Sequence, residues 1–158
     1  MPYSNIDSNL LSYMAGIIDG EGSIILSKSN RQRLSNKNPY YNVRISVSMC
    51  DKEIPILFYN TFGGSLQKRR RTLSMKHKMS YEWILSSKNS IEFLEIIIPY
   101  LRVNRKIETA NIYLEFQKHV SDLNIKYKQL GKEELNYREI FYLKCKELNH
   151  RGELYDAV

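Results

Sequence analysis

The strongest constraint on the fold is a two-residue alternation in residues 42–48, whose sequence is NVRISVS. Apolar side chains occupy the odd positions of this segment and polar side chains the even ones. Because successive side chains of a β-strand point to opposite faces, the pattern predicts a strand with one buried and one solvent-facing side. Residues 23–34 are also strand-forming, and residues 35–39 (SNKNP) have the composition of a turn. We therefore predict an antiparallel hairpin made by residues 23–34 and 40–49.

Helical and strand-forming segments alternate along the rest of the chain. Residues 8–20 carry apolar side chains at helical spacing, can be capped by Asp7 or Ser8, and end at two glycines that flank Glu21. A helix over residues 52–62, with Asp51 as a candidate cap, precedes a second predicted hairpin. The strands of that hairpin are residues 65–72 and 80–86, and further helices are predicted over residues 90–100, 105–120 and 132–148. This order predicts a single α+β domain over residues 1–158, with helices on one face of an antiparallel sheet and the other face open.

The positive charge of the chain is concentrated in the predicted hairpins. Residues 23–81 contain twelve lysines and arginines and two acids, an excess of ten charges, whereas the whole chain carries +7. A surface that only kept the protein soluble would mix its charges more evenly, so this asymmetry predicts a polyphosphate partner such as nucleic acid. The sequence holds no apolar run of membrane-spanning length and no signal-peptide or transit-peptide composition. We therefore expect no membrane partner and no secretion.

The most specific string is MAGIIDGEG, residues 14–22. It places Ala15 and Gly16 in an apolar helix and follows them with an acid-Gly-acid-Gly sequence. This string resembles the defining helix of the LAGLIDADG homing endonucleases, with Met14, Gly20 and Glu21 as substitutions by similar residue types. Residues 62–66 (FGGSL) are similar to the turn that leads into the third strand of that family. The resemblance covers residues 8–120, and it implies an αββαββα core with a saddle-shaped four-stranded sheet, followed by a helical C-terminal part over residues 121–158.

The resemblance also implies a catalytic site at the end of the first helix. Glu21 would hold Mg²⁺ on the floor of the saddle, with the Gly20 carbonyl as a second ligand. Mg²⁺ prefers oxygen ligands, and paired ions can activate water, neutralise a phosphate and stabilise the leaving oxygen. Lys106 is the best match for a lysine that the family uses before its later helix, and Asn104 and Arg105 are alternatives. By composition alone Glu21 would be an ordinary helix-terminal acid, so the site depends on the whole motif.

The single copy of the motif bears on the oligomeric state. Family members with two motifs are monomers, so a chain with one motif is expected to form a two-fold symmetric homodimer. Ala15 and Gly16 would let a partner helix approach closely, and Tyr13 and Asp19 would lie at the same interface. Alternatively, Ala15 and Gly16 could pack against the sheet of their own chain. For Asp19, the alternative to an interface role is a structural role near the end of the helix.

The predicted strands offer a surface for reading DNA. A two-stranded β-ribbon fits the major groove, where arginine suits guanine and asparagine suits adenine. The remaining lysines are expected to hold phosphates. For any one of these side chains, plain solvent exposure is an equal alternative to base contact. The resemblance and the alternation together nominate Ser27, Ser29, Arg31, Arg33, Asn42, Arg44, Ser46, Ser48, Lys68, Arg70, Glu82, Ile84 and Ser86.

One feature of the second predicted strand leaves catalysis open. Met49 stands at the end of the second strand, where the family often has a glutamine near the attacking water, and a thioether cannot orient water as an amide does. A catalytically silent DNA-binding protein therefore remains an alternative. The resemblance leaves a second alternative, because some proteins of the family act as intron RNA-splicing maturases on the same scaffold, with RNA as their partner. The abundance of Lys, Asn, Ile and Tyr is typical of AT-rich genomes. Members of the family are often encoded in organellar introns, so this composition favours a mitochondrion or chloroplast as the location of the protein.

Overall fold

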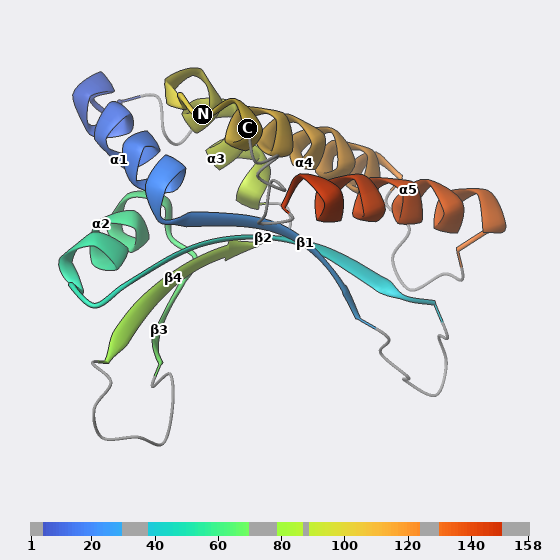
Figure 1. The fold of residues 1–158 in the computed structure, drawn as a ribbon, viewed down its shortest axis with the longest axis horizontal. Coiled ribbons are helices and arrows are strands. Elements are labelled where there is room, and N and C mark those ends of the chain that lie inside the picture. Colours follow the sequence, from blue (N-terminus) through green and yellow to red (C-terminus); the bar gives the residue numbers. More distant parts are fainter. Residues whose placement is uncertain (1–4, 30–37, 70–78, 87–88, 124–129, 150–158) are drawn as a thin grey trace, which may run out of the picture.

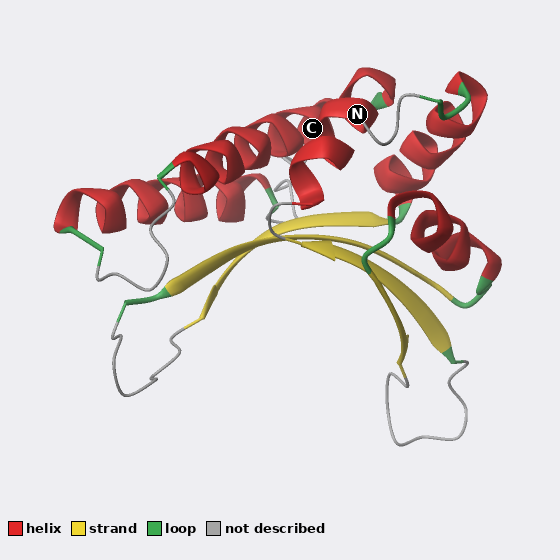
Figure 2. Cartoon of the chain, turned by 180° about the vertical axis from the view of Figure 1, so that it is seen from behind, coloured by secondary structure: helices red, strands yellow, loops and turns green. Residues whose placement is uncertain are grey.

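Helices cover one side of an arched antiparallel sheet (Figures 1 and 2). The computed structural model describes residues 5–29, 38–69, 79–86, 89–123 and 130–149 of the chain. No helix within these ranges is long and apolar enough to cross a membrane. The arrangement confirms the predicted α+β fold. In chain order the elements are α1 (Ser8–Gly20), β1 (Gly22–Ser29), β2 (Tyr40–Met49), α2 (Glu53–Phe62), β3 (Ser65–Arg69), β4 (Ser80–Ser86), α3 (Asn89–Ile97), the 3₁₀ turn η1 (Ile98–Tyr100), α4 (Asn104–Asp122) and α5 (Lys132–Leu148).

The sheet has the strand order β1-β2-β4-β3, and every neighbouring pair is antiparallel. Residues directly opposite each other in such a pair point to the same face. Val47 lies opposite Trp83, and both side chains are fully buried beneath the helices. The neighbouring positions, such as Ser46 opposite Ile84, point to the side turned away from the helices, which we call the open face. The alternation in β2 therefore divides the sheet as the sequence predicts.

Trp83 joins two helices to the centre of the sheet. Its ring centroid lies 4.8 Å from that of Phe58 in α2 and 5.4 Å from that of Phe93 in α3. Its indole nitrogen donates to the Gly63 carbonyl at 2.7 Å, so the buried polar atom is satisfied. Gly63 and Gly64 both have positive φ, and a Cβ on Gly64 would lie 2.4 Å from a main-chain oxygen of β4. These glycines let the chain leave α2 and enter β3 at once.

Several element ends differ from those predicted. Asp51 does not cap α2, which has Lys52 at its N-cap position and no side-chain cap hydrogen bond. The single helix predicted over residues 90–100 divides into α3 and η1, because Pro99 has no N–H to continue an α-helix. The outer parts of two predicted strands, residues 30–34 and 70–72, lie outside the described residues.

The C-terminal helix α5 is anchored to the first hairpin by a carboxylate. Glu139 accepts hydrogen bonds from the Lys28 ammonium at 2.6 Å and from the Tyr41 hydroxyl. Hydrogen bonding to Lys28 and Tyr41 lowers the pKa of Glu139 below its usual range. The Lys28 ammonium also lies 5.8 Å from the Tyr41 ring centroid. Helix α5, which follows the residues 8–120 that carry the family resemblance, is thus bound to the edge strand β1.

A second carboxylate joins α5 to α4. Glu134 is 2.9 Å from the His119 ring nitrogen and accepts from the Arg138 guanidinium at 2.5 Å. Burial of Glu134 acts to raise its pKa, but the hydrogen bonds from His119 and Arg138 outweigh burial and hold the pKa below its usual value. The pairing of α4 with α5 therefore includes a group that is sensitive to acid.

Candidate active site and nucleic-acid interface

The junction between α1 and β1 leaves Glu21 exposed at the start of the sheet. Glu21 is the C-cap of α1, and its N–H donates to the Ile17 carbonyl at 2.8 Å. The next residue, Gly22, is buried against Ile18, and a Cβ there would lie 2.6 Å from the Ile18 Cα. Since no real Cβ approaches backbone so closely, glycine is required for α1 to turn directly into β1. The glutamate is therefore held at a fixed place by the backbone on both sides of it.

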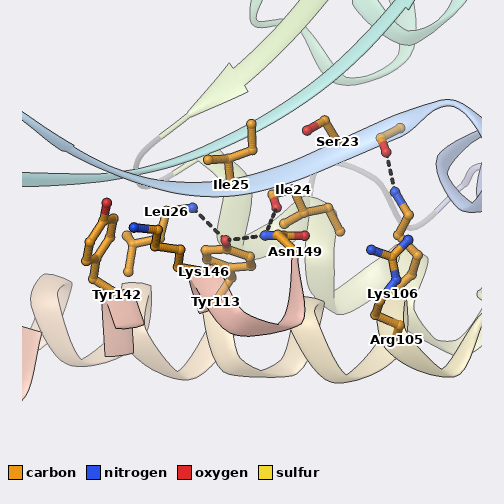
Figure 3. A pocket seen from close by; sticks show the side chains of 11 residues that line it. Ser23, Ile24, Ile25, Leu26, Arg105, Lys106, Tyr113, Tyr142, Lys146 and Asn149 are labelled. Carbon is orange, nitrogen blue, oxygen red and sulfur yellow. Dashed lines mark hydrogen bonds between the residues drawn. The ribbon is translucent and has the colours of Figure 1, made fainter. Parts of the chain in front are cut away.

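Lys106 is the basic candidate that reaches this junction. Its ammonium donates a hydrogen bond to the Gly22 carbonyl, one residue from Glu21 (Figure 3). Asn104 is the exposed first residue of α4, and the Arg105 guanidinium donates to the Leu148 carbonyl at 3.4 Å. Of the three candidates, Lys106 is therefore the one whose side chain the structure places in contact with the α1–β1 junction.

Asp19 fixes the start of α4 relative to α1. Its carboxylate accepts from the backbone N–H groups of Arg102 at 2.8 Å and Val103 at 3.4 Å, and Val103 is the N-cap of α4. A carboxylate at a helix N-terminus satisfies unpaired donors and is favoured by the helix dipole. This contact holds the segment that carries Lys106, which is the structural role considered for Asp19 in the sequence.

The donor atoms at the junction fit a metal ion shared with substrate. Among the described residues, no group of three or more His, Cys, Asp or Glu side chains is placed to hold a metal. The protomer offers one exposed carboxylate, that of Glu21, and the adjacent carbonyl of Gly20. Mg²⁺ is commonly held by one or two carboxylates together with water and substrate phosphates. Glu21 and Gly20 therefore suit an ion whose remaining ligands are water and substrate oxygens.

The strand register brings most of the predicted DNA-contacting side chains onto the open face. Ser27 lies opposite Asn42, Ser46 lies opposite Ile84, and the Ser27 hydroxyl donates to the Asn42 carbonyl at 3.1 Å. Ile25, which the sequence analysis did not nominate, shares this face and is 41% exposed. Three predicted residues, Arg31, Arg33 and Arg70, lie outside the described ranges. Those placed on the open face are Ser27, Ser29, Asn42, Arg44, Ser46, Ser48, Glu82, Ile84 and Ser86.

Glu82 forms ion pairs with arginines on both neighbouring strands. Its carboxylate lies 2.6 Å from the Arg44 guanidinium of β2 and 2.6 Å from that of Arg69 of β3. The Glu82 side chain is 9% exposed, whereas those of Arg44 and Arg69 are 31% and 49% exposed. Within the described part of the chain, the buried Nε of Arg44 has no hydrogen-bond partner. The cluster therefore places two guanidiniums on the open face, both held by the Glu82 carboxylate.

The expected orientation of β3 was wrong by one residue. Lys68 lies opposite Tyr81, on the side of the helices, and its ammonium is 5.9 Å from the Tyr81 ring centroid. Gln67 and Arg69 point to the open face instead. Because side chains alternate, a shift of one residue exchanges the two faces of a strand. Leu66, which lies opposite Trp83, is the sole apolar residue in β3 and could have fixed this orientation from the sequence.

The predicted dimer face of α1 also needs a correction. Ala15 is fully buried in the core of its own protomer, so its side chain is not available to a partner. Gly16 faces outward, with no atom within 4 Å of a Cβ built on it, and Tyr13 is 52% exposed.

Met49, the residue expected near the attacking water, packs against the core on the helix side of β2.

This combination of fold and site defines an endonuclease scaffold. Residues 14–120 match the model of the LAGLIDADG endonuclease family, and the chain belongs to that family. No curated protein matches the sequence.

Solved homing endonucleases share the fold. The structure is similar to I-CvuI in complex with its target in the presence of calcium, with 20% identity, a TM-score of 0.70, and coverage of 92% of this chain and 85% of that chain. It is also similar to the group I intron-encoded I-CeuI complexed with DNA, with 12% identity, a TM-score of 0.61, and coverage of 96% and 72%. I-SmaMI bound to uncleaved DNA with calcium ions matches with 18% identity and a TM-score of 0.56, and this chain covers only 45% of it while 90% of this chain is aligned.

Proposed function

We propose that the protein is a site-specific homing endonuclease that binds a long duplex DNA target as a homodimer and hydrolyses one phosphodiester bond on each strand with a divalent metal ion. The observation that carries the proposal is the exposed Glu21 carboxylate at the junction of α1 and β1, with the Lys106 ammonium bound to the carbonyl of the next residue, Gly22. We further propose that the protein acts in a mitochondrion or chloroplast, where AT-rich introns of this kind reside.

The open face supplies the binding part of this function. It carries amide, hydroxyl and guanidinium groups on three adjacent strands, β1, β2 and β4, and Arg69 on β3. These groups suit base edges in the major groove, because arginine and asparagine can form bidentate hydrogen bonds there. The excess of ten positive charges over residues 23–81 supports binding to the phosphate backbone along the same strands.

The α1–β1 junction supplies the catalytic part. Glu21 and the Gly20 carbonyl would hold Mg²⁺, which supplies an activated water and neutralises charge on the phosphate. Lys106 keeps a fixed positive charge at the same place, where it can stabilise an oxygen anion of the phosphate. Asp19 maintains the position of Lys106 through the start of α4.

A homodimer would bring two such junctions together. The outward side of α1 carries Gly16, whose surroundings are open, beside the exposed Tyr13, so a second α1 could pack closely there. This chain spans less than half of I-SmaMI, which supports a requirement for two copies in one complete site. Two-fold symmetry would then place one Glu21 at each of two scissile phosphates.

The test uses DNA that joins the two exons flanking the intron in which the reading frame lies. With Mg²⁺, the wild-type protein should cut both strands of this DNA. Glu21→Gln should retain DNA affinity, measured in Ca²⁺, and lose more than about 100-fold in cleavage rate, since several kcal/mol of transition-state stabilisation depend on the metal. Glu53→Gln is the matched control, because it removes an exposed carboxylate from α2 and should cut as the wild type does. Unimpaired cleavage by Glu21→Gln would overturn the site, DNA binding without cleavage would indicate a silent DNA-binding protein, and binding to the intron RNA alone would indicate a maturase.

A further inference from the structure

A groove of about 550 Å³ runs along the outer edge of β1, between that strand and helices α4 and α5 (Figure 3). Two of its lining residues, Ser23 and Ile25, belong to the open face. Its opposite wall carries Arg105 and Lys106 from α4 and Lys146 from α5. The groove therefore connects the open face with the helix layer around the edge of the sheet.

The charge of the groove indicates an anionic ligand. Three of its lining residues are cations, and none is an aspartate or glutamate. Within the described ranges, neither Arg105 nor Lys146 forms an ion pair with a carboxylate. Two cations that have no acidic partner among the described residues, held on neighbouring helices, are suited to bind a phosphate oxygen.

The backbone of β1 is not available to another strand. The Leu26 N–H donates to the Tyr113 hydroxyl at 2.6 Å, and the Asn149 amide donates to the Ile24 carbonyl at 3.0 Å. The Gly22 carbonyl accepts from Lys106. These side chains occupy three of the outward-facing polar groups that an added strand would need. The groove is consequently a poor site for an extended peptide, and its side-chain cations determine what it can bind.

We propose that this groove is a backbone-phosphate site, in which Arg105 and Lys146 bind a phosphate of the DNA strand that leaves the open face over the edge of β1. The proposal rests on the proposed function, because the ligand is the same duplex. It assigns α5, which lies beyond the residues that match the family model, a direct part in DNA binding. The contact contributes affinity and position without reading sequence.

The test compares Arg105→Ala and Lys146→Ala with Lys144→Ala. Lys144 is an exposed lysine of α5 that does not line the groove, so its loss changes the net charge equally. Dissociation constants for the cognate duplex and for an unrelated duplex of the same length are measured in Ca²⁺, without cleavage, at several salt concentrations. Because the homodimer carries two grooves, each groove variant should reduce the slope of log K against log salt by about 1.8, about 0.9 for each lost phosphate contact. This corresponds to about 12-fold less loss of affinity between 50 and 200 mM salt. Both duplexes should be affected alike, and Lys144→Ala should leave the slope unchanged.

The outcomes separate this proposal from the proposed function. If the wild type binds and cuts DNA while the groove variants behave as Lys144→Ala does, the groove assignment is wrong and the nuclease function stands. If the slopes fall as expected but no DNA is cut, the groove stands and the nuclease function fails. Thermal stabilisation by inorganic phosphate that is lost in Lys146→Ala, with no change in the DNA slope, would make the groove a free-anion site and overturn the proposal. An absence of duplex binding by the wild type would overturn both.

Discussion

The ion-pair cluster on the open face makes Glu82→Gln an informative substitution. Glu82 holds Arg44 and Arg69 at 2.6 Å each, and its own side chain is 9% exposed. Breaking a fully buried ion pair costs about 3–5 kcal/mol, and an exposed pair contributes about 1 kcal/mol or less. Because the carboxylate is buried but its partners are about one-third and one-half exposed, we expect Glu82→Gln to lower the free energy of unfolding by about 1–2 kcal/mol.

The same change should alter DNA binding in a specific direction. Removing the carboxylate raises the charge of the cluster by one in each protomer and releases two guanidiniums that it had held in place. Affinity for any duplex should therefore rise, with a salt dependence steeper by about 0.9 for each additional phosphate contact in each protomer. Affinity for unrelated DNA should rise more than affinity for the target, because the wild-type geometry of Arg44 and Arg69 suits particular base edges. The ratio of the affinity for the target to the affinity for unrelated DNA should therefore fall.

Fluorescence anisotropy with target and scrambled duplexes in Ca²⁺, at several salt concentrations, measures both quantities, and denaturant unfolding measures stability. Glu53→Gln serves as the control, since it changes the net charge equally on the helix side. If Glu82→Gln leaves both the affinity ratio and the salt dependence at the wild-type values, then the cluster does not organise the open face and the reasoning is refuted.

Three further predictions concern stability and assembly. Tyr113→Phe should lose about 1–3 kcal/mol in denaturant unfolding, because the buried N–H of Leu26 loses its acceptor; an unchanged midpoint would contradict the hydrogen bond. Gly22→Ala should lower the free energy of unfolding by about 3 kcal/mol, because its Cβ would clash with the Ile18 backbone. Gly16→Ala should change the free energy of unfolding by no more than about 1 kcal/mol and should weaken the dimer in analytical ultracentrifugation, because Gly16 faces outward. Equal losses of stability in the two variants would contradict these positions of the glycines. The pKa of Glu134 in the folded protein lies below its usual value of 4.5. The ionised carboxylate therefore stabilises the fold above pH 4.5, and this stabilisation is lost as the pH falls through the folded-state pKa. Glu134→Gln should therefore flatten the acid limb of the unfolding free energy against pH, and an unaltered limb would assign that limb to other groups.

The sequence predicted the elements whose local pattern agrees with their packing. β2, β4 and α5 have the predicted bounds, and those of β2 follow from its alternation of apolar and polar residues. The orientation of β3 was missed because its one apolar residue, Leu66, gives a weak periodicity beside a run of basic residues. The burial of Ala15 was missed for a different reason. A small residue in an apolar helix suits its own core as well as a partner helix, and the sequence cannot distinguish the two.

Contacts between distant segments were beyond prediction from the sequence. Glu21 could be nominated from its motif, but the hydrogen bond from Lys106 to the Gly22 carbonyl joins residues 84 positions apart. The hydrogen bond from Asn149 to Ile24 spans 125 positions and places α5 against β1. No local propensity encodes such contacts, since they depend on how α4 and α5 pack over the finished sheet. The groove therefore emerged only from the structure, although two of its cations, Arg105 and Lys106, were candidates from the sequence.

The central claim, that two symmetry-related Glu21 carboxylates each serve one DNA strand, can be tested with a mixed dimer. Wild-type and Glu21→Gln protomers with different affinity tags are co-expressed, the mixed dimer is isolated by sequential purification, and a supercoiled plasmid carrying the target is digested with Mg²⁺. The account predicts that nicked circular plasmid accumulates, with one strand cut at the target. Linear plasmid formed at the wild-type rate would contradict it, because a single Glu21 would then suffice for both strands.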